Sequence, residues 1–257
     1  MRILASNDDG IGAPGLKILA DALAELGEVT VVAPDRERSA TGHSITLNRP
    51  LRANRIHRGW YSVDGTPADC VALALKGLLP EPAELVVAGI NEGTNLGDDV
   101  TYSGTVAAAA EGTLCGCPAF AVSLGTEGGS GPHWETAGRY AVVVAREITS
   151  RGLPPGTLLN VNVPDLPLDR IRGVAVTRQG RRTYSETIVE KVDPRGKTYY
   201  WIGGEPPRWE RGGGTDYDAL MAGAVSVTPL HLDLTNYAAL ESLRAWTLSP
   251  NGHRVTV

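Results

Sequence analysis

The chain has 257 residues, of which 42% are hydrophobic, 21% charged and 5% aromatic, a composition that suits a globular protein and excludes a disordered or fibrous one. Lys and Arg total 24 against 29 Asp and Glu, so the formal charge is −5 and no cationic surplus exists to neutralise nucleic acid. Because the apolar runs are far shorter than the roughly 20 residues that span a bilayer, and the first residues lack a signal-peptide core, we expect a cytoplasmic protein with no membrane partner.

The first part of the chain has the pattern of two strands joined by a helix. We predict a strand over residues 2–6, a helix over 14–26 and a strand over 29–33. Leucines recur at helical spacing behind Pro14, and Gly27 supplies a C-terminal stop. Two strands linked by a crossover helix imply a right-handed βαβ unit in a parallel sheet.

The middle of the chain repeats this alternation. Residues 43–63 read as irregular strands or a hairpin, followed by a helix over 67–79, a strand over 85–90, a polar loop over 91–99, a helix over 106–112, a strand over 120–124 and a helix over 135–150. Thr66 suits the N-cap of the second helix and Pro67 its first position. The pattern predicts an α/β fold.

The sequence pattern changes near residue 152, where Pro- and Gly-rich turns separate shorter apolar runs. We predict strands at 158–163, 174–177, 187–192, 198–202 and 224–228, and helices at 216–221 and 236–246. Residues 193–197 have hairpin-turn chemistry, and an exposed aromatic hairpin often pairs with another subunit. We therefore expect a core at 1–151 and a smaller C-terminal part at 152–257, with an extended β-hairpin and a final helix that packs back.

Polar oxygen-bearing side chains follow three of the predicted strands. Asp8 and Asp9 come after the first, Ser39 after the second, and Asn91 and Asn95 after the third. Ligands of parallel sheets bind beyond the carboxyl ends of the strands, and such oxygens suit Mg²⁺ or Mn²⁺. The alternative is that either aspartate caps a helix or turns a loop, but three strand ends together favour a metal site.

The tripeptide Ser103-Gly104-Thr105 begins a predicted helix and resembles a phosphate-binding site. It offers two hydroxyls, a glycine that permits close approach, and the positive end of a helix dipole. An ordinary N-cap explains the tripeptide equally well. Proximity to the predicted metal loop favours anion binding.

Familiar alternatives lack their signatures. The sequence contains no Gly-x-Gly-x-x-Gly after the first strand, no complete P-loop, no His-Glu-x-x-His and no Gly-x-Ser-x-Gly. His43 and His231 lie beside polar loops and are candidates for an acid or base. The three cysteines, an odd count, are best read as free thiols.

With these residues assembled, the sequence resembles the SurE survival-protein family along its whole length. The motifs that carry the resemblance are Asn7–Ile11 with Ala13–Gly15, Ala33-Pro34 with Ser39, Gly65–Asp69, Gly89–Asn95, Tyr102–Val106 and Val227–His231. The resemblance implies a Rossmann-like α/β core and a homodimer or homotetramer formed through C-terminal strands. It also implies one divalent cation per subunit, bound by Asp8, Asp9, Ser39 and Asn91, and a phosphate held by Asn95, Ser103, Gly104 and Thr105.

Together with these residues, the resemblance implies a metal-dependent phosphomonoesterase acting on nucleoside 5′-monophosphates, with 3′-monophosphates and short polyphosphate as further substrates. Catalysis would rest on Asp8 and Asp9, with either water or an aspartate as the nucleophile. One alternative is a non-catalytic nucleotide or phosphate sensor that uses the same metal site. Another is an amide-cleaving metal hydrolase, for which His43 alone is thin support.

Overall fold

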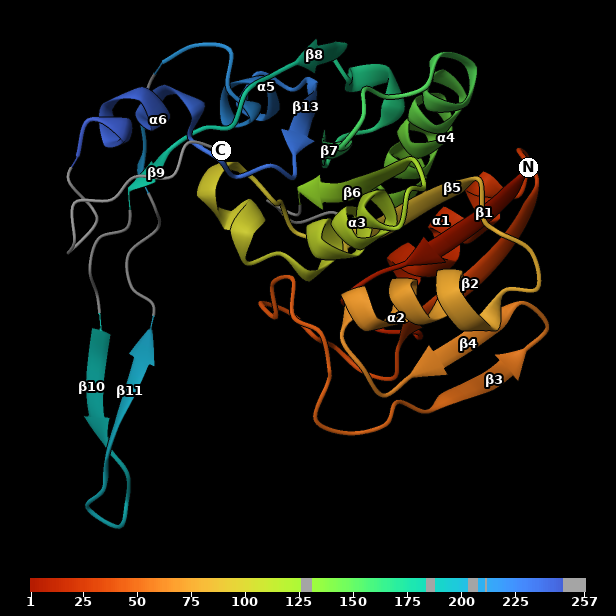
Figure 1. Cartoon of the computed structure of the whole chain (residues 1–257), viewed down its shortest axis with the longest axis horizontal. Helices are drawn as coiled ribbons and strands as arrows, with labels where there is room; N and C mark the ends of the chain where they lie inside the picture. Colours follow the sequence, from red (N-terminus) through yellow and green to blue (C-terminus); the bar gives the residue numbers. More distant parts are fainter. Residues whose placement is uncertain (126–130, 184–187, 203–207, 211, 247–257) are drawn as a thin grey trace.

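A nine-stranded mixed sheet crosses the molecule in the computed structural model, which describes residues 1–125, 131–183, 188–202, 208–210 and 212–246 (Figure 1). In order across the sheet, the strands are β3 (Ala53–His57), β4 (Trp60–Val63), β2 (Glu28–Pro34), β1 (Arg2–Ser6), β5 (Leu85–Glu92), β6 (Ala119–Gly125), β7 (Thr157–Pro164), β13 (Val225–His231) and β8 (Val174–Val176). The six strands from β4 to β7 are parallel, which confirms the Rossmann-like core.

Both edges of the sheet include antiparallel pairs; the first is a hairpin within residues 43–63, one of the two predicted readings, and the second was not predicted. β3 pairs antiparallel with β4, because a two-residue connection can only join antiparallel neighbours. At the other edge β13 runs antiparallel to β7, and β8 follows the direction of β13. The sheet therefore continues across residue 152, and the division of the chain at that residue stays a prediction.

Four helices cover the two faces of the sheet. These helices are α1 (Pro14–Leu23), α2 (Pro67–Leu73), which continues as a π-helical turn η1 (Ala74–Leu78), α3 (Gly104–Leu114) and α4 (Trp134–Arg151). α1 packs against α4 on one face, and α2 against α3 on the other, as Figure 1 shows. Each pair closes its own hydrophobic core over the central strands.

The helix ends follow local chemistry, with one difference. Thr66 caps α2 and exchanges hydrogen bonds with Asp69 in a capping box, as its position predicts. α1 ends at Leu23, three residues before the predicted end. Gly27 is required for another reason than a helix stop: a Cβ at this position would lie 2.0 Å from the carbonyl oxygen of Met1.

The C-terminal part also contains smaller elements. They are η3 (Leu168–Arg170), α5 (Asp216–Met221), α6 (Tyr237–Arg244) and a two-stranded pair of β9 (Arg182–Thr183) with β12 (Arg208–Trp209). Of these, α5 packs against β7 and β13. α6 buries none of its residues, so its packing against the body stays a prediction.

The predicted β-hairpin is formed by β10 (Ile188–Val192) and β11 (Thr198–Ile202), and it projects away from the body (Figure 1). Asp193 closes the turn by accepting hydrogen bonds from the backbone N–H groups of Arg195 and Lys197. Thr187, the first residue of the predicted strand, lies outside the described residues. Across the described part of the chain, no helix has the length and apolar character required to cross a membrane.

Candidate active site at the carboxyl edge of the sheet

The predicted site residues meet where the strand order reverses. The chain builds β2 and β4 on one side of β1, then crosses back to place β5, β6 and β7 on the other side. β1 and β5 are therefore neighbours with diverging connections, which opens a crevice at their carboxyl ends. Asp8 and Asp9 follow β1, and Asn91 lies near the end of β5.

Asp8 lies against the N-terminus of α3. Its side chain is buried, and Oδ1 accepts a hydrogen bond from the Thr105 hydroxyl, 97 positions further along the chain. The Thr105 Oγ1 atom is also 3.3 Å from Asn91 Oδ1, so one hydroxyl joins the two strand ends. At Gly104 an added Cβ would lie 2.7 Å from the Cβ of Asp8, and only glycine permits this approach.

The two adjacent carboxylates have raised pKa values. Burial raises the pKa of Asp8, against the opposing effect of hydrogen bonds from the Thr105 side chain and from the backbone of Thr105 and Gly104. Burial also raises the pKa of Asp9 to about 6, and the neighbouring charge of Asp8 adds to this rise. Two partly buried anions side by side favour protonation or the binding of a cation.

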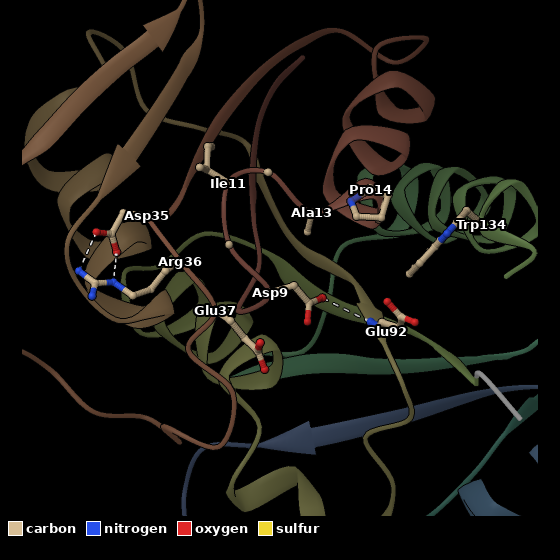
Figure 2. Close-up of a pocket in the computed structure, with 12 residues that line it drawn as sticks. Asp9, Ile11, Ala13, Pro14, Asp35, Arg36, Glu37, Glu92 and Trp134 are labelled. Carbon is tan, nitrogen blue, oxygen red and sulfur yellow. Dashed lines mark hydrogen bonds and ion pairs between the residues drawn. The ribbon is translucent and has the colours of Figure 1, made fainter. Parts of the chain in front are cut away.

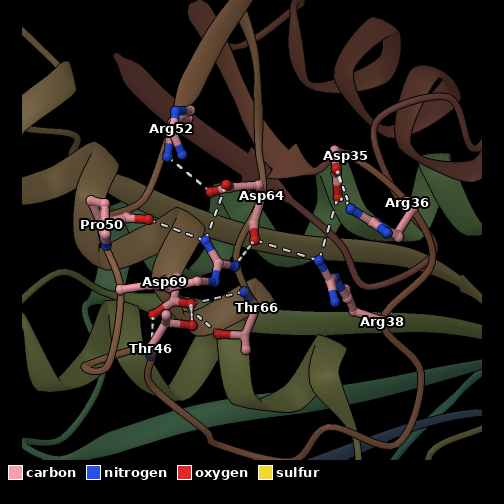
Figure 3. A network of polar contacts seen from close by, with 10 residues as sticks. Asp35, Arg36, Arg38, Thr46, Pro50, Arg52, Asp64, Thr66 and Asp69 are labelled. Carbon is pink, nitrogen blue, oxygen red and sulfur yellow. Dashed lines mark hydrogen bonds and ion pairs between the residues drawn. The ribbon is translucent and has the colours of Figure 1, made fainter.

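The loop after β2 brings Ser39 to the same place. The backbone N–H of Arg38 donates to the carbonyl oxygen of Asp8 at 2.7 Å, which ties this loop to the end of β1. The Arg38 guanidinium lies 3.5 Å from Asp35 and donates to the Asp64 carbonyl (Figure 3). Further along the loop, Thr46 donates from its backbone and hydroxyl to the buried Asp69.

An irregularity in β5 directs Asn91 toward the crevice. The pairing of β5 with β6 shifts between Ala88 and Asn91, and the intervening Gly89 has φ +136°. A Cβ at Gly89 would lie 2.2 Å from the Val122 carbonyl oxygen, so the strands pass too close for another residue. The Asn91 amide nitrogen donates to Gly93, which leaves its oxygen beside Thr105.

These residues surround a cavity of about 220 Å³, named here the acidic cavity. It is lined by Asp8, Asp9, Ser39, Ala40, Asn91, Glu92, Asn95, Asp99, Tyr102 and Ser103. All four predicted metal ligands line it, together with Asn95 and Ser103 of the predicted phosphate site. Gly104 and Thr105 stand behind Asp8 instead, with Thr105 fully buried.

Asn95 and Ser103 are held in the wall by hydrogen bonds. The Ser103 hydroxyl caps α3 by accepting the Val106 N–H at 3.1 Å, so the N-cap interpretation is confirmed and its own proton stays available to a ligand. Asn95 Nδ2 donates to Ser123 at 2.8 Å, and its backbone bonds to Asn162. Ser123 and Asn162 lie on buried strands and carry no sequence signal of this supporting role.

The donor set fits a hard divalent cation. The four predicted ligands bring two carboxylates, one amide oxygen and one hydroxyl to the wall of the acidic cavity, and such oxygens suit Mg²⁺ or Mn²⁺. Within the described residues no three His, Cys, Asp or Glu side chains gather in a metal-binding arrangement, so the set depends on Ser39 and Asn91 for its neutral oxygens. A zinc site built on thiols and imidazoles is not found among them.

A second cavity, of about 350 Å³, lies on the other side of Asp9 between the loops after β1 and β2 (Figure 2). Asp9 accepts a hydrogen bond from the Glu92 backbone at 3.3 Å and separates this cavity from the first. Asp35 and Glu37 add further carboxylates, and Arg36 pairs with Asp35. No pattern in the sequence singles out Glu37 or Glu92 for this position.

Neither histidine considered in the sequence lines the acidic cavity. His43 Nε2 is 3.0 Å from a carboxylate oxygen of Glu111 on α3. His231 pairs in register with Thr157 at the start of β7. This is the amino end of the parallel strands, opposite to the carboxyl ends where the acidic cavity lies. On the wall of the cavity, Asp99 forms an ion pair with Arg182.

The fold and the site define a doubly wound α/β protein with a carboxylate-lined cavity at its topological switch point. Residues 3–186 match the family described as survival protein SurE. The relative from Geobacter sulfurreducens, named 5′-nucleotidase SurE, is 57% identical over 249 residues, covering 97% of this chain and 95% of the relative. The chain belongs to the SurE family.

Other comparisons agree with this assignment. The 5′-nucleotidase SurE of Legionella pneumophila is 55% identical over 243 residues, covering 95% of this chain and 96% of the relative. The crystal structure of the SurE protein from Aquifex aeolicus superimposes with a TM-score of 0.85 at 46% identity, covering 95% of this chain and 98% of that chain. The resemblance stated from the sequence is confirmed.

Proposed function

We propose that this chain hydrolyses nucleoside 5′-monophosphates to nucleoside and orthophosphate at the acidic cavity. The observation that carries the proposal is the convergence of Asp8, Asp9, Ser39 and Asn91 on one cavity beside the N-terminus of α3. Relatives 53–57% identical over nearly the whole chain are named 5′-nucleotidase, which supports the same activity here. As in the sequence-based hypothesis, 3′-monophosphates and short polyphosphate are further candidate substrates.

One divalent cation per subunit, Mg²⁺ or Mn²⁺, would be held by Asp8, Asp9, Ser39 and Asn91. When bound, such an ion supplies Lewis acidity at a phosphoryl oxygen and offsets the charge of the two carboxylates. Thr105 fixes the orientation of Asp8 through its hydroxyl, and Gly104 allows the helix to approach. These two residues of the predicted phosphate site therefore support Asp8 as well.

The protein groups that remain around the cavity are suited to bind the phosphate. The Ser103 hydroxyl accepts from its own helix, so it donates outward. Asn95 gives one amide hydrogen to Ser123 and has a second for a phosphoryl oxygen. Phosphoryl transfer depends mainly on positioning and charge stabilisation, which this arrangement provides.

Hydrolysis adds water across the phosphorus–oxygen bond of the ester. The water oxygen joins phosphorus, the nucleoside oxygen leaves with a proton, and Asp8 and Asp9 are the carboxylates whose oxygens can hold a proton in transit. Direct attack by either carboxylate, through an acyl phosphate, is the second route. Borohydride reduction of a quenched single turnover separates the two, because it converts an acyl phosphate into an alcohol that mass spectrometry detects.

The experiment that tests the proposal uses metal-free protein reconstituted with Mg²⁺, Mn²⁺ or Zn²⁺. Orthophosphate release is measured with the nucleoside monophosphates, small phosphate esters and short polyphosphate. We expect turnover of 5′-monophosphates with Mg²⁺ or Mn²⁺. Stoichiometric nucleotide binding without turnover would favour the sensor alternative, and cleavage of amides alone would favour the amide hydrolase.

The substitution Asp8→Asn tests the site directly. We expect turnover with Mn²⁺ to fall by more than about 100-fold, because even the groups that orient a metal ligand cost 10–100-fold when removed. The matched control is Asp21→Asn, at an exposed aspartate of α1 that pairs with Lys17 on the surface. Near-normal turnover of Asp8→Asn, with a circular dichroism spectrum like that of the wild type, would refute the assignment.

A further inference from the structure

A larger cavity lies next to the acidic cavity, on the other side of the loop that follows β5. Its volume is about 530 Å³, within the range of small-molecule binding sites. The wall includes Leu96 of the loop, Trp209 of β12, and Tyr217, Leu220 and Met221 of α5. We name it the aromatic cavity.

The chemistry of the aromatic cavity suits a flat organic ring. Tyr217 stacks on Trp209 with ring centroids 4.6 Å apart and an interplanar angle of 12°. Leu96 and Leu220 are buried, whereas Met221 is half-exposed and can adapt to a ligand. Such apolar walls with a few polar groups are typical of sites for heterocyclic ligands.

The two cavities meet at Asp99, which lines both of them. Residues of the intervening loop divide between the two sides: Asn91 and Asn95 line the acidic cavity, and Thr94 and Leu96 the aromatic cavity. A ligand with a phosphate at one end and a ring at the other can therefore contact both faces of this loop.

The shared loop is fixed to the wall of the aromatic cavity. The backbone N–H of Gly97 donates to Asp216 at 2.8 Å, and its carbonyl accepts from Gln179 at 3.0 Å. Gly97 has φ +52°, and a Cβ there would lie 2.6 Å from the Gly180 carbonyl oxygen and 2.9 Å from the Trp209 ring. The spacing between the two cavities is therefore set by buried contacts.

The cavity of Figure 2 is the competing location for the organic part of a substrate, and its chemistry is less suitable. Four carboxylates, those of Asp9, Asp35, Glu37 and Glu92, line it against the single guanidinium of Arg36. An anionic nucleotide would meet like charges there. In the aromatic cavity, the positive charge of Arg182 offsets the negative charge of the aspartates. Arg182 forms an ion pair with Asp99, and its Cζ atom lies 5.9 Å from the centroid of the Trp209 ring.

We propose that the aromatic cavity binds the nucleoside part of the substrate, with its base between the Trp209–Tyr217 pair and the side chains of Leu220 and Met221. This inference rests on the proposed function, because it takes the phosphate to lie in the acidic cavity. Tyr217 and Met221 are then specificity residues: they contact the base of a nucleotide and make no such contact with a small phosphate ester, which has no base.

The test fills the cavity from its half-exposed side with Met221→Trp. Steady-state kinetics with Mn²⁺ are measured for the four common nucleoside 5′-monophosphates and for glycerol 2-phosphate, which has no base. We expect KM for the nucleotides to rise at least tenfold, and the ratio of their kcat/KM to that of glycerol 2-phosphate to fall at least tenfold. Tyr217→Ala, which removes the stacked ring, should change the ratio in the same direction.

The matched control is Ala222→Trp, an exposed position next to Met221 that does not line the cavity. It should leave the substrate ratio unchanged. Calorimetric titration with adenosine gives a readout independent of turnover, and Met221→Trp should weaken this binding at least tenfold. An unchanged ratio with unchanged adenosine binding would overturn the inference while leaving nucleotidase activity intact; absence of turnover in the wild type would instead count against the proposed function.

Discussion

Asp9 is a side chain whose charge depends on pH and on what occupies the acidic cavity. Its pKa of about 6 in the metal-free protein lies above the ordinary value of 3.8, because of burial and the charge of Asp8. The folded state therefore binds the proton more tightly than the unfolded state does. The resulting stabilisation is fully present below about pH 3.8 and is lost as the pH rises through about 6.

This sign gives a prediction for Asp9→Asn, which removes the charge. In EDTA at pH 7.5 we expect the variant to be more stable than the wild type by about 1–2 kcal/mol, an amount already reduced for the partial exposure of the carboxyl group. At pH 4 the difference should vanish. Urea denaturation at both pH values measures it, with Asp21→Asn as the control.

Addition of Mn²⁺ should make the wild type more stable than Asp9→Asn, the reverse of the order expected in EDTA. A cation binds ionised carboxylates, so Mn²⁺ should raise the melting temperature of the wild type more at pH 7.5 than at pH 5. At pH 7.5 it should raise the melting temperature of Asp9→Asn less than that of the wild type. Equal effects of pH on both metal-free proteins would show that Asp9 does not titrate in this range.

The position of α3 determines the site at the scale of secondary structure. The helix presents small side chains to β5 and β6, and this lets its N-terminus approach Asp8. Gly112 packs tightly on β5, since a Cβ there would lie 2.9 Å from the Cβ of Val86. A larger residue must push the helix from the sheet or strain the contact.

Gly112→Ala should therefore destabilise the protein by about 1–3 kcal/mol, even though alanine favours helices. The matched control is Gly77→Ala in the exposed turn η1, where the nearest atom to an added Cβ is 3.9 Å away. This control should be neutral or stabilising by up to about 1 kcal/mol. Urea denaturation of both variants measures the difference, and equal effects would contradict the tight packing of α3 on β5.

The exposed hairpin is the feature of the whole molecule that points to assembly. One face of β10–β11 carries Ile188, Val192 and Ile202 around the central pair of Glu190 and Tyr200, and Ile202 is 95% exposed. A two-stranded hairpin alone is marginally stable in water, and a face with several exposed large apolar side chains marks an interaction surface. We propose that a second copy of the chain covers it, in the homodimer or homotetramer expected from the sequence.

The double substitution Ile188→Lys with Ile202→Glu should shift the protein toward the monomer, because it buries charge in the proposed interface. Light scattering coupled to size-exclusion chromatography measures the mass. Lys197→Glu, in the turn of the same hairpin, is the control and should keep the wild-type mass. A wild-type protein that is monomeric at micromolar concentration would contradict the proposal.

Local sequence determined much of the fold. The end of α3 that forms the site, the capping box at Thr66 and the turn at Asp193 depend on residues within a few positions of each other, so spacing alone predicts them. The strand ends that carry Asp8 and Asn91 were also predictable, because apolar runs stop abruptly there. The hairpin of β3 and β4 was one of the two readings of residues 43–63, but the antiparallel pairing of β13 with β7 was missed, since pairing direction depends on which strands meet.

Only the tertiary structure decided how these pieces combine. It places the Thr105 hydroxyl against Asp8 and the aromatic cavity beside the acidic one. It also places His231 beside the start of β7, at the end of the sheet away from the site. The physical reason is separation along the chain: Asp8 and Thr105 are 97 positions apart, and Gly97 and Asp216 are 119 apart. Contacts at such separations follow from strand order and close packing, which no local pattern of residues specifies.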